Sequence, residues 1–126
     1  RRKSIKSIDK GAAQIKKGMS VLLFPEGTRS LDGALQPFRP GSFIMAIKSQ
    51  VPIIPITVSG TINVMHKNDP FNLNLNRKVK VIISPPIKTE NYALEDRHQL
   101  KEKIEGIISR NYEKIRDLSY VDYSKS

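Results

Sequence analysis

The sequence contains no cysteine and no tryptophan, and only two of its 126 residues are histidine. The absence of cysteine excludes disulfides, thiolate metal sites and a cysteine nucleophile, and it is compatible with a reducing compartment. His66 and His98 stand alone, without the several ligands that zinc requires. We therefore expect neither a metal nor a tightly held cofactor.

Long apolar runs are also absent. No stretch approaches the roughly 20 apolar residues that a membrane-spanning helix needs, and no segment resembles a signal peptide. A membrane anchor of the protein would therefore have to lie elsewhere. With 38% hydrophobic residues, the chain can bury one small core, which indicates one domain or part of one.

Acidic residues are few, and the formal net charge is +10. Residues 1–20 carry seven bases and one acid, residues 21–89 eight bases and three acids, and residues 90–126 seven bases and eight acids. The positive excess in the first two segments favours anionic partners such as lipid headgroups, a phosphorylated substrate, coenzyme A or nucleic acid, although a solvated basic face would give the same composition. Aromatic residues make up only 6%, which argues against a nucleic-acid-stacking platform.

Hydrophobic periodicity predicts an α/β domain with a mixed sheet flanked by helices. An amphipathic helix should end near Gly18 and pack on the sheet, and Pro55 should impose a bulge or an edge on the sheet. Residues after 117 should fray or dock loosely. We expect helices at residues 4–17, 41–50 and 92–116, loops at 31–40 and 61–76, a strand at 77–84, and a central strand at 53–59 beside one at 20–24.

Residues 21–30, Val-Leu-Leu-Phe-Pro-Glu-Gly-Thr-Arg-Ser, join an apolar run to a turn rich in polar residues. Strand ends of this kind form ligand crevices in α/β sheets. Arg29 offers a planar fork that can hold a phosphate with two hydrogen bonds, and the Thr28 hydroxyl and the amides around Gly27 add donors. The motif therefore predicts a phosphate-binding loop at residues 24–30. Arg39 is either a second cation, for phosphate or coenzyme A, or an ordinary surface arginine.

Residues 24–30, followed by Gly33, Pro37-Phe38 and Gly41 and then by Val-Pro-Ile-Ile-Pro-Ile at 51–56, resemble the glycerolipid acyltransferases, in particular the 1-acyl-sn-glycerol-3-phosphate acyltransferases. The resemblance implies an enzyme of phospholipid synthesis, associated with the cytoplasmic side of a membrane. The resemblance also implies transfer of an acyl group from acyl-CoA or acyl-carrier protein to lysophosphatidate, giving phosphatidate. The same resemblance assigns the acceptor phosphate to Glu26, Gly27, Thr28 and Arg29, and the acyl side to Pro52 and Pro55. Because a carboxylate repels phosphate, we expect Glu26 to orient Arg29 or to accept a hydrogen bond from the acceptor.

The catalytic signature of this family, a histidine followed five residues later by an aspartate, is missing. Phe71 and Lys103 stand five residues after His66 and His98. We therefore interpret residues 1–126 as the C-terminal part of a single acyltransferase domain whose catalytic base lies upstream of Arg1. We expect the isolated chain to be inactive, with both histidines away from Glu26 and Arg29. A non-catalytic lipid- or membrane-binding relative is the alternative hypothesis, and a basic nucleic-acid-binding module is a weaker one.

Overall fold

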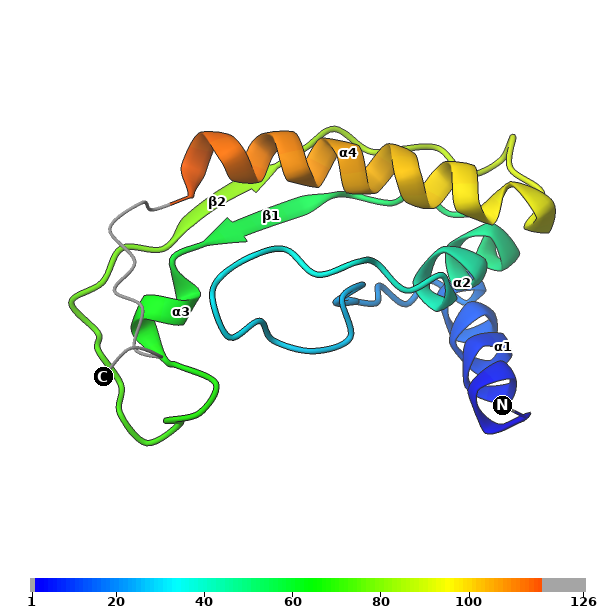
Figure 1. Ribbon diagram of the computed structural model, residues 1–126. Helices are drawn as coiled ribbons and strands as arrows, with labels where there is room; N and C mark the ends of the chain where they lie inside the picture. Colours follow the sequence, from blue (N-terminus) through cyan, green and yellow to red (C-terminus); the bar gives the residue numbers. More distant parts are fainter. Residues whose placement is uncertain (1, 117–126) are drawn as a thin grey trace.

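The computed structural model describes residues 2–116, with side chains from residue 5 onward, so the expected fraying after residue 117 lies outside the described residues. Helix α4 runs along a small sheet, and α1 and α2 pack against each other at one end of the molecule (Figure 1). This arrangement confirms the α/β class. The elements are α1 (Arg2–Lys16), α2 (Gly41–Ser49), β1 (Ile56–Ser59), α3 (Thr61–Val64), β2 (Lys80–Ile83), the 3₁₀ turn η1 (Leu94–Asp96) and α4 (Arg97–Ile115).

Helix α1 ends where the sequence predicts. Gly18 has a positive φ of 97°, and its N–H donates to the Ile15 carbonyl at 2.9 Å, which closes the last turn. The helix packs on α2 rather than on the sheet, and the prediction of a sheet contact was therefore wrong. At the crossing, a Cβ on Gly11 would come within 2.7 Å of the end of the Met45 side chain, so a larger residue would require Met45 to move.

The hydrophobic core lies between α2, α4 and the segment that precedes α2. Phe38 and Phe43 stack with ring centroids 6.4 Å apart. Phe43 is 3% exposed, which places it in the core. The stripe predicted on the last helix supplies the opposite wall of the core: Leu100, Ile104 and Ile108.

Strands β1 and β2 pair antiparallel, with Ile56 opposite Ile83 and Ser59 opposite Lys80. Before β1, Ile53 forms an isolated bridge with Ile87. Three positions separate Ile53 from Ile56 and four separate Ile83 from Ile87, so the second strand carries one extra residue opposite Pro55. A residue without an N–H cannot continue the ladder, and the predicted irregularity at Pro55 is thus confirmed.

The two faces of the sheet differ in burial. Thr57 and Ser59 are buried, and α4 packs against both strands (Figure 1). The cross-strand pairs of the other face, Ile56 with Ile83 and Val58 with Val81, expose between 41% and 70% of each residue. The outer face of the sheet is therefore apolar and open to solvent.

The predicted strand at residues 20–24 is absent, and the sheet of the described residues contains only β1 and β2. Residues 21–24 are instead irregular, and Leu22 and Phe24 are 70% and 78% exposed. Apolar residues of high strand propensity form a strand only when a neighbouring strand satisfies their backbone groups. Neither β1 nor β2 pairs with this segment, so the strand expected beside residues 53–59 does not form, and the sheet of residues 2–116 is antiparallel and not mixed.

Helix α4 fixes the segment of residues 24–40 at two points. The Phe38 N–H donates to Glu105 Oε1 at 3.1 Å, and the Tyr112 hydroxyl donates to the Gly33 carbonyl. Partial burial alone would raise the pKa of Glu105, but hydrogen bonds from Lys101 and from the Phe38 N–H outweigh it and lower that pKa below its ordinary value of 4.5. Glu105 is therefore a charged anchor for the segment.

We expect Glu105→Ala to destabilise the fold by about 1 to 3 kcal/mol at neutral pH, because it leaves the half-buried Phe38 N–H without an acceptor. Since the pKa of Glu105 is lowered on folding, its contribution is present above 4.5 and is lost as the pH falls through the folded-state pKa. Urea unfolding at neutral and acidic pH measures both effects. Glu102→Ala, on an exposed position of the same helix, is the control; an equal loss in both variants would contradict the anchor.

Two glycines allow a matched test of backbone packing. Gly60 and Gly18 have similar positive φ angles of 94° and 97°, but a Cβ on Gly60 would lie 2.3 Å from the Lys78 carbonyl oxygen, whereas one on Gly18 would meet nothing within 4 Å. Gly18→Ala should cost only the backbone strain of about 1 to 2 kcal/mol. Gly60→Ala should cost clearly more, because the β1–α3 connection must also move away from β2. Equal shifts in the unfolding midpoint would show that the contact is unimportant.

Candidate functional site

The turn at residues 24–27 has the geometry that its sequence predicts. The Gly27 N–H donates to the Phe24 carbonyl at 3.0 Å, and Gly27 has a φ of 73°. The Arg39 N–H donates to the Pro25 carbonyl at 2.8 Å, which brings the far end of the loop back to its start. Residues 24–40 therefore form a closed loop, which we call the phosphate loop.

Arg39 lies directly against Gly27. A Cβ at Gly27 would be 2.7 Å from Arg39 Nε and 3.0 Å from Cζ, so a larger residue at position 27 would force the Arg39 side chain to move. The predicted second cation is thus brought beside the Glu-Gly-Thr-Arg block. Neither Arg29 nor Arg39 forms an ion pair with a described carboxylate, which leaves two guanidinium groups able to meet an anion.

Glu26 does not orient Arg29 in this structure. Its Oε2 atom accepts a hydrogen bond from the Gln36 N–H at 2.7 Å, across ten residues of the phosphate loop. Of the two roles expected for Glu26, the ion pair with Arg29 is not formed among the described residues, and the hydrogen bond from the acceptor stays a prediction. Carboxylates accept strong hydrogen bonds from backbone N–H groups, so Glu26 connects the start of the loop to Gln36 near its end.

Thr28 and Arg29 are exposed, and both are contacted by a residue that the motif did not indicate. Lys67 Nζ donates to Thr28 Oγ1 at 3.1 Å and to the Arg29 carbonyl at 3.0 Å. Lys67 comes from the turn after α3, close to 40 positions further along the chain. No spacing rule links it to the block, so sequence reasoning had no signal for it.

His66 contacts the phosphate loop at Leu31, one residue beyond the predicted phosphate-binding block of residues 24–30. Its Nε2 atom is 3.1 Å from the Leu31 carbonyl, and its Nδ1 atom accepts the Asn68 N–H at 3.2 Å. Because Nδ1 is an acceptor, the ring proton resides on Nε2 and is donated to Leu31. Both ring nitrogens thus bind backbone groups, as expected of a structural histidine.

The two prolines assigned to the acyl side lie outside the phosphate loop. Pro55 is buried beside the start of β1, where its carbonyl accepts the Ser84 N–H at 2.9 Å, and Pro52 is exposed. The predicted phosphate-site residues lie together in the phosphate loop: Glu26, Gly27, Thr28, Arg29 and Arg39. Pro55 is instead hydrogen-bonded to Ser84, the residue after β2.

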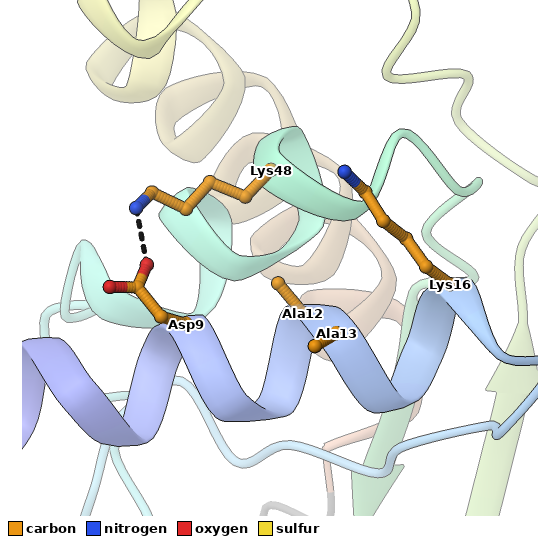
Figure 2. A pocket seen from close by; sticks show the side chains of 5 residues that line it. All are labelled: Asp9, Ala12, Ala13, Lys16 and Lys48. Carbon is orange, nitrogen blue, oxygen red and sulfur yellow. Dashed lines mark hydrogen bonds and ion pairs between the residues drawn. The ribbon is translucent and has the colours of Figure 1, made fainter.

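Two surface clefts lie away from these residues. One, of about 270 Å³, lies between α1 and α2; Ala12 and Ala13 form its floor and the Asp9–Lys48 ion pair crosses its rim (Figure 2). A second, of about 420 Å³, includes Tyr92 and Lys103. Neither includes a predicted site residue. Across residues 2–116 there is also no cluster of acidic or histidine side chains suited to a metal, and no helix long and apolar enough to cross a membrane.

Comparison with known proteins identifies what this arrangement is similar to. The acyltransferase family model matches residues 1–59, which include the phosphate loop and both prolines. The chain is 51% identical over 73 residues to the chloroplastic 1-acyl-sn-glycerol-3-phosphate acyltransferase BAT2 of Brassica napus, covering 58% of this chain and 21% of that protein. It is 41% identical over 85 residues to the 1-acyl-sn-glycerol-3-phosphate acyltransferase of Salmonella typhimurium, covering 68% of this chain and 33% of that protein.

The fold is similar to the crystal structure of the 1-acyl-sn-glycerophosphate acyltransferase PlsC of Thermotoga maritima. The TM-score is 0.73 at 27% identity, and the match covers 85% of this chain and 43% of that one. The matched regions thus span less than half the length of each of these relatives. On sequence and fold together, the chain belongs to the acyltransferase family that includes the 1-acyl-sn-glycerol-3-phosphate acyltransferases.

Proposed function

We propose that this chain holds the phosphate of lysophosphatidate during acyl transfer to its free hydroxyl, the reaction that gives phosphatidate. The main support for the proposal is the closed phosphate loop. It places the exposed Arg29 at the same turn as Arg39, whose side chain lies against Gly27. Guanidinium groups bind phosphate with paired hydrogen bonds, and the Thr28 hydroxyl adds a donor. The names of the relatives support a 1-acylated glycerol phosphate as the acceptor.

Holding the phosphate would aim the acceptor hydroxyl at the acyl donor. Fixing a reactant in this way lowers the entropic part of the barrier, but it does not activate the hydroxyl. In this family a histidine paired with an aspartate removes the hydroxyl proton, and neither His66 nor His98 has an aspartate five residues later. The proposed division of roles is therefore acceptor binding by these residues and proton removal by a His-Asp pair not among them. The isolated chain remains predicted to be inactive.

The acyl donor and the acyl side of the site are further parts of the proposal. A thioester of coenzyme A or of acyl-carrier protein is the donor that the family uses, and both carry phosphate groups that suit the positive excess of residues 1–89. Pro52 and Pro55 stay assigned to the acyl side. Support comes from the strand that begins directly after Pro55, since Ile56 and Val58 present an exposed apolar surface.

Arg29→Lys should weaken binding of a short-chain lysophosphatidate about tenfold, or about 1.4 kcal/mol, because lysine keeps the charge and loses the bidentate fork. Titration calorimetry on the chain itself measures this, with the corresponding monoacylglycerol as the phosphate-free ligand. Arg110→Lys, on an exposed position of α4, is the matched control and should bind like the unaltered chain. Unchanged affinity in the Arg29 variant would remove Arg29 from the phosphate site.

The proposed location is the surface of an anionic membrane on its cytoplasmic side. Helix α1 carries exposed lysines, whereas α4 carries mixed charges, so α1 should contribute most to lipid attraction. Lys6→Gln with Lys10→Gln should reduce co-sedimentation with phosphatidylserine vesicles more than the equally charged change of Lys103→Gln with Lys114→Gln. Binding should fall with salt, because exposed charges are screened over about 8 Å at physiological ionic strength. Equal binding to phosphatidylcholine vesicles would contradict an electrostatic attachment.

A further inference from the structure

We infer that Lys67 is a third cation of the acceptor-phosphate site, which rests on the proposed function of the phosphate loop. Lys67 lies in the turn between α3 and β2, beyond the residues that the family model matches. Its Nζ atom is nevertheless within hydrogen-bond distance of two consecutive members of the predicted block, Thr28 and Arg29. The anion-binding surface is therefore built from two separate parts of the chain.

The hydrogen bonds of Lys67 determine how Thr28 can act. An ammonium group has three N–H donors and no lone pair, so the Thr28 hydroxyl must be the acceptor in this contact. Its own proton then remains available to an anion, apart from a long 3.5 Å contact to the Arg29 carbonyl. Two of the three ammonium protons are used by Thr28 and Arg29, and the third is left for a ligand. Lys67 and Thr28 can thus both donate to the same phosphate.

The charge of Lys67 is not neutralised by a neighbouring carboxylate. None of the ion pairs among the described residues includes it, although Asp69 is only two residues away. Lys67 as a whole is half-buried, but its Nζ contacts to Thr28 and Arg29 lie at the exposed surface, where an incoming anion can reach them. Together with Arg29 and Arg39, Lys67 makes three cations at the phosphate loop. The two carboxylates of the loop accept backbone N–H groups, Glu26 from Gln36 and Asp32 from Ala34.

A hydrogen bond from the neighbouring His66 explains how Lys67 reaches the loop. The Asp69 N–H donates to the His66 carbonyl at 3.2 Å, which forms a tight turn, and the His66 ring donates to the Leu31 carbonyl. His66 and Lys67 therefore form hydrogen bonds to neighbouring groups within residues 28–31. This arrangement fixes the lysine at the loop before a ligand arrives, which reduces the entropy lost on binding.

The test compares glycerol 3-phosphate, a dianion, with its methyl diester, a monoanion, as calorimetric probes. Lys67→Gln should weaken binding of the dianion roughly 3- to 10-fold, and should lower the dianion-to-monoanion affinity ratio, because a contacting cation favours the more highly charged probe. Lys67→Arg should retain most of the ratio. Lys80→Gln, an exposed lysine of β2, makes the same change in net charge and should leave the ratio unchanged.

A structural role for Lys67 would give a different result. If Lys67 only supports the loop, the Gln variant weakens both probes equally and the ratio stays constant, which would overturn the inference. Chemical labelling of the unaltered chain is a second measurement, which does not depend on a variant that folds. Glycerol 3-phosphate should slow acylation of the Lys67 amine by an amine-reactive reagent and leave the acylation of Lys80 unaffected. Absence of protection would also overturn the inference. The Arg29→Lys variant separates the two proposals, because normal binding there would overturn the phosphate site itself.

Discussion

The position of Phe38 is the constraint on which the candidate site depends. Phe38 is the one buried apolar residue of the phosphate loop: its ring packs on Phe43 and its N–H is held by Glu105 of α4. The next residue, Arg39, is then fixed by its own N–H to Pro25, and its side chain covers Gly27. An exposed loop of polar residues would otherwise sample many conformations at a considerable entropic cost. Packing one phenylalanine into the core places two guanidinium groups at the same turn.

Much of this arrangement is predictable from local patterns. The apolar stripe of α4, the end of α1 at Gly18, the irregularity at Pro55 and the turn around Gly27 follow from side-chain periodicity and from the restricted backbone of proline and glycine. Each of these features depends on residues within a few positions of one another. They could therefore be deduced without knowing which parts of the chain meet in space.

The residues that sequence reasoning missed depend on distant contacts. Lys67 and His66 come after β1 in the sequence and still contact the phosphate loop, which precedes β1. Glu26 accepts a hydrogen bond from Gln36 and does not pair with Arg29. No periodicity or motif records which backbone groups a side chain will find across such separations. A sequence read as motifs thus identifies the chemistry of a site better than it identifies the groups that complete it.

The missing strand at residues 20–24 follows from the same distinction between local and distant effects. Four apolar residues give a strong local preference for a strand, but a strand is stable only when a second one pairs with it. Here β1 pairs with β2 alone, and the segment keeps its apolar side chains in solvent immediately before the phosphate loop. Phe24 and Leu22 therefore lie exposed beside a turn that carries Arg29. An apolar surface that continues into a cationic turn suits a ligand with an acyl chain and a phosphate, which is the chemical character of the acceptor proposed above.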